Sequence, residues 1–454
     1  MKFRSTRSLI VGKMKILLNS TTNRVISLTL LGSALTLCVD ISIAARLGTG
    51  AVMDAFVLAL SAPLLIDLVF REGTKFSLVP ILIGRRECLT SYDYSNFVNG
   101  MLNFFLCVGV VTLFLFEIAA ANIIDLLGPG LGTEARQQSV KLLRLIAPLI
   151  IFAMTTPILS VYLNSQKQFY LAALRSSVTS LVILITLASY WTSVDIDIFI
   201  ASAYSLAFMA FFVILSAGAQ INGLHYKIGC WLSFDDFLEL AYAMGLPSAG
   251  FALRYVSRLV ERAIASSIVI GGVSAYYLAW RLFSAVQTLI ASSIATVALP
   301  DMARHSLNGY QLELAATINT NLLKAVTLSS PVALICFWFS DELITLLYAR
   351  GVFDSFAVKS TAKVLHWLAP GIIPGCMIPI LTSSLYAQKK YHLVFLFMLT
   401  STILNIGLAW LFSSYWGLGG IAAAASLVAV SSVIGLSILI HMGGTPLLRF
   451  SHRI

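Results

Sequence analysis

Long apolar runs recur along the whole chain and constrain its fold more than any other feature of the sequence. A run of about 20 helical residues crosses a hydrocarbon core of roughly 30 Å, and a helix satisfies all its own backbone hydrogen bonds, as lipid requires. The sequence therefore predicts an all-α membrane protein with about twelve transmembrane helices. They are expected near residues 25–45, 51–83, 97–120, 142–163, 170–191, 196–217, 240–268, 274–300, 315–339, 360–386, 391–413 and 417–441.

The composition agrees with a membrane protein. The chain is 58% hydrophobic and 11% charged, whereas a soluble domain carries about 25% charged residues. Lysine and arginine number 30 against 20 acidic residues, which gives a net charge of +10. In a membrane protein this excess is typical of a basic cytoplasmic surface, so we expect no nucleic-acid partner.

The motifs of enzymes and metal sites are missing from the sequence. The six cysteines are scattered, without the CxxC spacing of a metal site, and most fall in apolar segments. The sequence also lacks a Walker motif, an HExxH motif and a nucleophile elbow. We therefore expect neither an enzyme, nor a cofactor, nor a bound metal.

Basic residues gather at one set of helix ends and predict the orientation in the membrane. Under this rule, these ends and both chain termini are cytoplasmic, and the opposite ends carry more acids, such as Asp195 and Asp354. The basic set includes Lys2, Arg4, Arg7, Lys13, Lys15, Arg24, Arg85, Arg86, Lys167, Lys227, Arg304, Lys389, Lys390, Arg449 and Arg453.

An internal repeat predicts two bundles of six helices. Residues 142–169 align without a gap on residues 364–391, at a constant offset of 222. Pro148 then falls on Pro370, and Lys167 on Lys389. An even number of crossings separates the copies, so they are parallel repeats about an axis along the membrane normal. The expected bundles are residues 1–222 and 223–454.

The predicted helix over residues 51–83 carries charges where lipid tails should lie: Asp67, Arg71, Glu72 and Lys75. A charge near the bilayer centre costs at least ~2.5–3.5 kcal/mol on insertion scales, so such residues normally face a bundle interior or a water-filled cavity. We interpret this helix as one wall of a polar pathway. The alternative is that these residues pair within the helix, since Asp67 and Arg71 are four residues apart and Glu72 and Lys75 are three residues apart.

The predicted helix over residues 240–268 carries Arg254, Arg258 and Arg262 at intervals of four, so that all three lie on one face near Glu261. Arg281 follows in the next helix. Together with Arg71 and Lys75, these cations form a ladder across the membrane. Planar guanidinium groups bind phosphate oxygens in pairs, so the ladder favours a diphosphate as ligand. The alternative is a structural pairing of these arginines with Glu261 or another acid.

Several acids are candidates for cavity or ion-coupling roles: Asp40, Asp67, Glu72 and Glu261. Asp40 is the only acid in the first predicted helix, where it serves either as an ion or proton site or as the partner of a neighbouring arginine. The residues alone do not decide between these roles.

Four stretches resemble the MurJ/MviN lipid II flippase family of the multidrug/oligosaccharidyl-lipid/polysaccharide exporter superfamily. They are ARLGTGAVMDAFVLALSAPLLIDLVFREGTKFSLVPIL, LLRLIAPLIIFAMTTPILSVYLNSQKQF, GGVSAYYLAWRLFSAVQTLIASSIATVALPDMARH and LLYARGVFDSFAVKSTAKVLHWLAPG. The resemblance implies two six-helix bundles in a V around a central cationic cavity. Asp54, Glu72 and Arg281 match cavity positions of the family. Asp67 stands where the family has an arginine, and the first helix reads SALTLCVD in place of the family's arginine-containing pattern.

The resemblance further implies a multi-pass protein of the bacterial inner membrane that moves a polyprenyl-diphosphate-linked glycan outward by alternating access. The cargo is either lipid II or a polysaccharide repeat unit. Membrane lipids and glycan polymerases or synthesis enzymes are the implied partners. Two alternatives stay open: an ion-coupled small-molecule exporter of the same superfamily, and a non-transporting scaffold of a glycan-synthesis complex.

Overall fold

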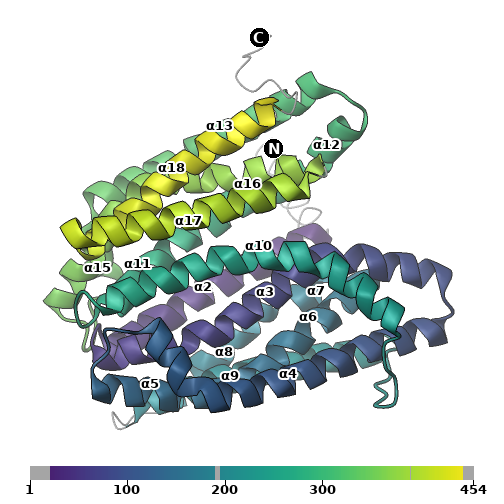
Figure 1. The fold of residues 1–454 in the computed structure, drawn as a ribbon, viewed down its shortest axis with the longest axis horizontal. Coiled ribbons are helices and arrows are strands. Elements are labelled where there is room, and N and C mark those ends of the chain that lie inside the picture. Colours follow the sequence, from purple (N-terminus) through teal and green to yellow (C-terminus); the bar gives the residue numbers. More distant parts are fainter. Residues whose placement is uncertain (1–20, 190–194, 389, 443–454) are drawn as a thin grey trace, which may run out of the picture. The chain divides into compact units, whose positions relative to one another are not determined.

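The structure, a computed structural model, describes residues 21–189, 195–388 and 390–442, and all their regular elements are helices. Both termini and Lys389, which the orientation prediction uses, lie outside the described residues. The all-α prediction is confirmed. The helices are α2 (Thr21–Leu47), α3 (Ala51–Cys88), α4 (Ser91–Leu127), α5 (Thr133–Ile146), α6 (Leu149–Ser165), α7 (Phe169–Ala173), α8 (Arg175–Ser189), α9 (Ile196–Ile221), α10 (Phe234–Ser266), α11 (Gly272–Gln287), the π-helix η1 (Thr288–Ser292), α12 (Ser293–Leu307), α13 (Gln311–Trp338), α14 (Ser340–Tyr348), α15 (Ser355–Leu368), the 3-10 helix η2 (Ala369–Gly371), α16 (Ile372–Ala387), α17 (Tyr391–Trp416) and α18 (Leu418–Met442) (Figure 1).

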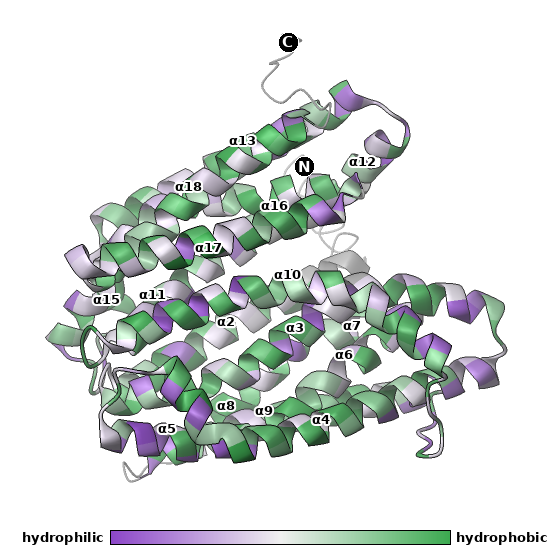
Figure 2. Ribbon diagram, viewed as in Figure 1, coloured by the Kyte–Doolittle hydropathy of each residue, from purple (hydrophilic) through white to green (hydrophobic). Residues whose placement is uncertain are grey.

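Each of the twelve predicted ranges coincides with one helix or with consecutive helical segments. Among the described residues, nine segments are long and apolar enough to cross a membrane. Three predicted ranges fall short of that measure. They contain α8, which has 15 residues, α10, which carries many charges, and α11, which ends at a π-helix. Figure 2 shows long apolar stretches on α4 and α9 and polar bands along α10.

The helix boundaries confirm the repeat. The helices α5 and α15 have 14 residues each and begin 222 positions apart, and α6 and α16 end 222 positions apart. Both pairs are interrupted at an Ala-Pro dipeptide, because proline lacks the N–H that would continue the helical ladder. The same offset relates the starts of α7 and α17 and the starts of α9 and α18. The repeat therefore reaches to the last helix of each half.

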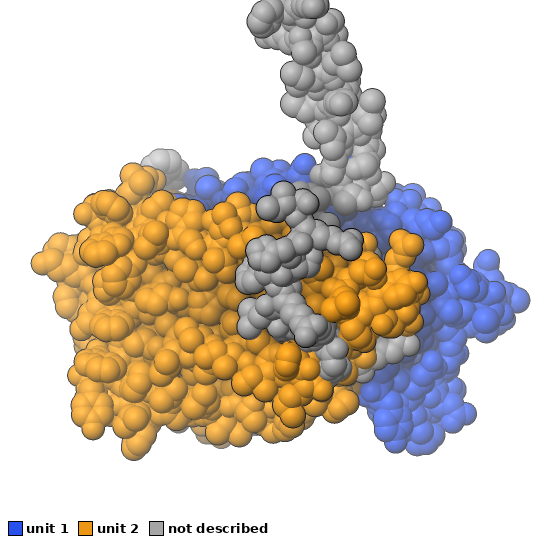
Figure 3. All heavy atoms as spheres, turned by 90° about the horizontal axis from the view of Figure 1, so that it is seen from above, with its two compact units in different colours: residues 1–42, 70–118, 144–244 blue, residues 43–69, 119–143, 245–454 orange. Residues whose placement is uncertain are grey.

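The chain forms two compact units whose limits differ from those of the sequence repeat (Figure 3). The first unit contains residues 1–42, 70–118 and 144–244, and the second contains residues 43–69, 119–143 and 245–454. The helices α3 and α10 each contribute to both units. In the second unit, α13, α16, α17 and α18 pack alongside one another (Figure 1).

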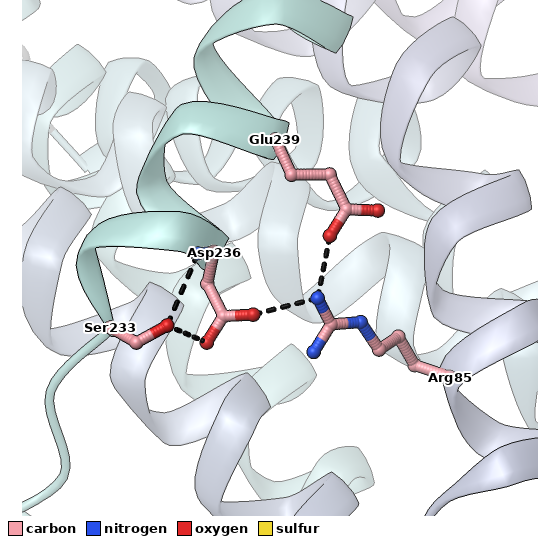
Figure 4. A network of polar contacts seen from close by, with 4 residues as sticks. All are labelled: Arg85, Ser233, Asp236 and Glu239. Atoms are coloured by element: carbon pink, nitrogen blue, oxygen red, sulfur yellow. Dashed lines mark hydrogen bonds and ion pairs between the residues drawn. The ribbon is translucent and has the colours of Figure 1, made fainter.

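In the first unit, an ionic network joins the end of α3 to the start of α10 (Figure 4). The Arg85 guanidinium donates to Asp236 at 2.6 Å and to Glu239 at 2.5 Å. Ser233 donates to the second oxygen of Asp236 at 2.6 Å and accepts the Asp236 N–H, and so caps α10. Burial raises the pKa of Asp236, but the hydrogen bonds from Ser233 and Arg85 outweigh burial and leave the pKa below its ordinary value.

In the second unit, two glycine turns of the repeat make matching contacts. The Gly351 turn, which follows α14, packs on the end of α2, where the Val352 N–H donates to the Ala45 carbonyl at 3.0 Å. A Cβ on Gly351 would lie 2.0 Å from that carbonyl oxygen. Correspondingly, a Cβ on Gly130 would lie 2.2 Å from the carbonyl oxygen of Ser266, at the end of α10. Each turn from one half of the sequence thus packs against the end of the first helix of the other half.

Candidate functional site

The second unit contains a cavity of about 150 Å³ that brings together part of the predicted cationic ladder. Arg254 and Arg258 line it from α10, one helical turn apart, and Glu261 lines it from the next turn. The other walls come from α11, α16, α17 and α18. They include Ser257, Trp280, Phe283, Gln287, Thr382, Ser401, Thr402, Asn405 and Ser432.

Glu261 is buried, with 1% of its surface exposed, and its hydrogen-bond donors are neutral. The Tyr276 hydroxyl donates to Oε2 at 2.7 Å, and the Asn405 amide donates to Oε1. Asn405 also donates to Ser257 Oγ at 2.7 Å, which fixes the amide on α17 against α10. The carboxylate is therefore held in place without direct hydrogen bonds from the arginines of its own helix.

Arg258 lies over the face of Trp280, with its guanidinium carbon 4.6 Å from the ring centroid. Trp280 in turn stacks on Tyr276 at 6.1 Å and packs against Phe283 at 4.8 Å. A cation over an indole face gains about 0.5–2 kcal/mol, so the aromatic group orients the guanidinium without consuming its N–H donors. Those donors remain suited to an anion in the cavity.

Arg262 and Arg281 are not among the side chains that line this cavity. Arg262 is 7% exposed and donates to Ser61 Oγ from α3, and its guanidinium lies 5.3 Å from the Tyr277 ring. Arg281 lies over the same ring at 5.8 Å. The structure therefore places these two cations around Tyr277, next to the part of α3 that belongs to the second unit.

Asp54 has a structural contact in the second unit. Its carboxylate accepts the N–H of Gly271 at 2.7 Å and the N–H of Ser274 at 2.8 Å, at the first turn of α11. Gly271 has φ +84°, and a Cβ there would lie 2.5 Å from the Thr49 carbonyl oxygen, which explains the glycine. Asp54 is 2% exposed and acts as a helix cap.

The remaining predicted residues occupy different settings within their own units. Arg71 donates to Glu72 at 2.5 Å, so at least one pairing forms within α3. Lys75 is exposed. Asp40 and Asp67 are buried at 3% and 5% exposure.

The cavity also contains residues that the sequence analysis missed. Asn405 and Trp280 contact Glu261 and Arg258, yet neither is ionisable at physiological pH, and the analysis followed charges. A lone asparagine in the apolar run of α17 was the available signal, because a buried amide in a membrane helix needs a polar partner.

Comparison with known proteins places this geometry in a family. The family model for the lipid II flippase MurJ matches residues 43–446. A probable lipid II flippase MurJ of Buchnera aphidicola (subsp. Schizaphis graminum) is 24% identical over 359 residues, 78% of this chain and 70% of the relative. The probable lipid II flippase MurJ of Thermotoga maritima is 21% identical over 399 residues, 88% of this chain and 80% of the relative.

Solved structures show the same fold. The inward closed conformation of lipid II flippase MurJ matches with a TM-score of 0.81 at 21% identity, over 92% of this chain and 87% of that chain. An inward-facing MATE multidrug-resistance transporter matches with a TM-score of 0.78 at 12% identity, over 95% of this chain and 100% of that chain. With the family model matching most of its length, the chain belongs to the MurJ lipid II flippase family.

Proposed function

We propose that this protein moves a polyprenyl-diphosphate-linked glycan across the bacterial inner membrane by alternating access. Lipid II, the substrate named for its relatives, and a polysaccharide repeat unit are the two candidate cargoes. The supporting observation in this chain is the cavity in which Arg254 and Arg258 lie one turn apart beside neutral hydroxyl and amide groups. Charge-assisted bonds from guanidinium to phosphate are strong and directional, which suits a diphosphate.

The cations divide into roles by their contacts. Arg254 and Arg258 are the proposed diphosphate ligands, because they line the cavity. Arg262 and Arg281, which gather around Tyr277, are candidate contacts at another stage of the path. Arg71 and Lys75 lie in the part of α3 that belongs to the first unit, and they are candidate contacts there.

Among the acids, Glu261 is the best-supported coupling group, and Asp40, Asp67 and Glu72 remain further candidates. The donors to Glu261, Tyr276 and Asn405, are neutral, and they can bond to either protonation state after small rotations. When the Glu261 carboxyl group gains or loses a proton, the charge beside Arg258 changes. This change would alter the affinity for a diphosphate, as coupling requires.

Genetic replacement tests the cargo. We expect deletion of this gene to change either peptidoglycan precursor transport or a surface polysaccharide, and expression in cells depleted of their own lipid II flippase separates the two. Because the first-helix arginines are absent and Asp67 replaces another, we predict poor rescue and a surface-polysaccharide defect. Full rescue at native expression would establish lipid II as the cargo. Absence of any glycan-lipid phenotype would contradict the proposed function.

A further inference from the structure

The segment between α9 and α10, residues 222–233, is held against α4 through its backbone. Asn99 donates to the His225 carbonyl at 2.9 Å, and Asn103 donates to the carbonyls of Lys227 and Cys230 at 2.8 Å each. The Tyr226 hydroxyl donates to the Asn103 side-chain oxygen at 2.7 Å. The backbone carbonyls and the Tyr226 side chain are thus turned to α4, and other side chains of the segment, such as Ile228 and Trp231, face outward.

A glycine on α4 allows this close approach. A Cβ on Gly100 would lie 3.1 Å from the Trp231 carbonyl carbon and 3.2 Å from the Leu232 nitrogen. The side chains on the outer surface of the segment are large and apolar. Ile228 is 76% exposed and Trp231 is 62% exposed, and Phe234, which begins α10, is 73% exposed.

The segment covers one end of a row of side chains on α4, and the rest of this row faces lipid. Asn99 and Asn103 share one face of α4 with Cys107, Phe114 and Ile118, because these positions fall within about 100° around a helix of 3.6 residues per turn. The two asparagines are buried by the segment, whereas Phe114 and Ile118 are 62% and 82% exposed. Apolar side chains exposed on a membrane helix contact lipid. The outer surface of the segment therefore continues a lipid-facing surface.

The depth along α4 can be inferred from its charges. Glu117 pairs with Arg144 at 3.6 Å, and both are at least one-third exposed, so this level marks one edge of the hydrocarbon layer. About 20 helical residues cross that layer, which puts the opposite edge near Phe97. Asn99 and Asn103 lie within two turns of that edge. The segment that they hold is thus at the boundary between the acyl chains and the headgroups.

We propose that residues 226–234 form an interfacial membrane anchor that inserts Ile228, Trp231 and Phe234 into the adjacent headgroup layer. Tryptophan is enriched at this depth, where its apolar ring and polar N–H both find partners. Lys227, 4.4 Å over the Tyr92 ring, places a cation at the same level, where anionic lipid headgroups attract it. The connection between the two halves of the sequence is then attached both to α4 and to the bilayer.

Fluorescence quenching by brominated lipids tests the anchor in the purified full-length protein. The Trp231→Phe variant and the wild type are placed in nanodiscs of phospholipid brominated either near the headgroup or near the chain end. The wild-type minus variant signal, which is that of Trp231, is expected to lose about half its intensity with bromine near the headgroup and less with bromine at the chain end. Trp410→Phe is the positive control, because Trp410 is 68% exposed within an apolar span.

A Trp231 signal that is equal in brominated and unbrominated lipid, while the Trp410 signal is quenched, would overturn the proposal and indicate a water- or protein-facing surface. Asn103→Leu provides the second arm. It removes the amide that captures the segment but keeps an apolar helix surface, and we expect it to reduce the quenching of Trp231. Unchanged quenching in that variant would refute the role given to Asn103. Neither outcome depends on which glycan the protein moves.

Discussion

Replacing Arg258 by alanine tests whether the cavity binds a travelling diphosphate. The change removes a guanidinium that lines the cavity and leaves the apolar packing of α10 largely intact. A hydrogen bond to a charged group contributes about 1.5–3 kcal/mol, and 1.36 kcal/mol corresponds to a factor of ten, so transport should fall by about 10- to 150-fold. The variant also loses the stacking of Arg258 on Trp280, which should lower the free energy of unfolding by about 0.5–2 kcal/mol.

The structure separates this role from a structural one. Glu261 keeps its donors Tyr276 and Asn405 when Arg258 is removed, so the amount of folded protein should fall no further than the lost Trp280 contact explains. Arg258→Lys should restore transport only in part, because an ammonium group keeps the charge and loses the planar pair of donors. Arg262→Ala is the contrasting variant. Arg262 lies outside the cavity, and its removal leaves Ser61 without its hydrogen-bond donor, which should lower the protein level. A loss of transport per molecule as well would support the proposed role of Arg262 at another stage of the path.

The assay scores protein level and outward movement of the glycan lipid in wild type, Arg258→Ala, Glu261→Gln and the double variant. If Arg258 served only to neutralise a buried acid, neutralising Glu261 in the alanine background would restore both quantities. That result would refute the substrate-binding role. Loss of transport at normal protein level in the Arg258→Ala single variant is the expected result. Glu261→Gln and the double variant are expected to lose transport as well, because Glu261 is the proposed coupling group, so their protein levels are the informative quantity.

Three further predictions concern a glycine turn, the Asp236 network and the orientation in the membrane. Gly351→Ala should lower the thermal unfolding temperature, because it places a Cβ on a backbone carbonyl at φ +60°, whereas Gly132→Ala, which has open space around it, should not. The ionic network of Asp236 should stabilise the protein at pH values above the ordinary carboxyl pKa of about 4 and lose this contribution as pH falls through its lowered pKa; unfolding of wild type and Asp236→Asn compared across pH 3–6 measures it, and parallel curves would contradict it. In a background without native cysteines, Lys359→Cys should react with an impermeant reagent from outside intact cells and Lys167→Cys should not; the reverse pattern would invert the predicted orientation.

The sequence supported the fold prediction well because both of its signals are local. Apolar length locates a membrane helix, and a constant offset of 222 relates two copies without any knowledge of packing. Both signals appear in the observed boundaries of α5 and α15. The sequence predicted one helix near 274–300. The structure divides this range into α11, the π-helix at Thr288–Ser292 and α12, a local change of helical register that hydropathy does not reveal.

The site was predicted only in part, because charges on one helix face do not reveal their partners. The spacing of Arg254 and Arg258 correctly put both on one face, and the structure places that face on a cavity. The spacing did not reveal that Arg262 turns to Ser61, or that Asp54 caps α11, since those partners lie about 200 residues away. Long-range contacts of this kind become visible only in three dimensions.

Native mass spectrometry of the protein purified with its membrane lipids tests the central claim most directly. The wild type should retain a lipid whose mass and fragments identify a polyprenyl diphosphate bearing a glycan, and Arg258→Ala should retain about tenfold less of it, in line with the loss of one charge-assisted contact. Equal retention of ordinary phospholipids in both proteins is the control. If the wild type carries only phospholipids, or if the alanine variant retains the glycan lipid undiminished, the proposed cargo or its binding site is wrong.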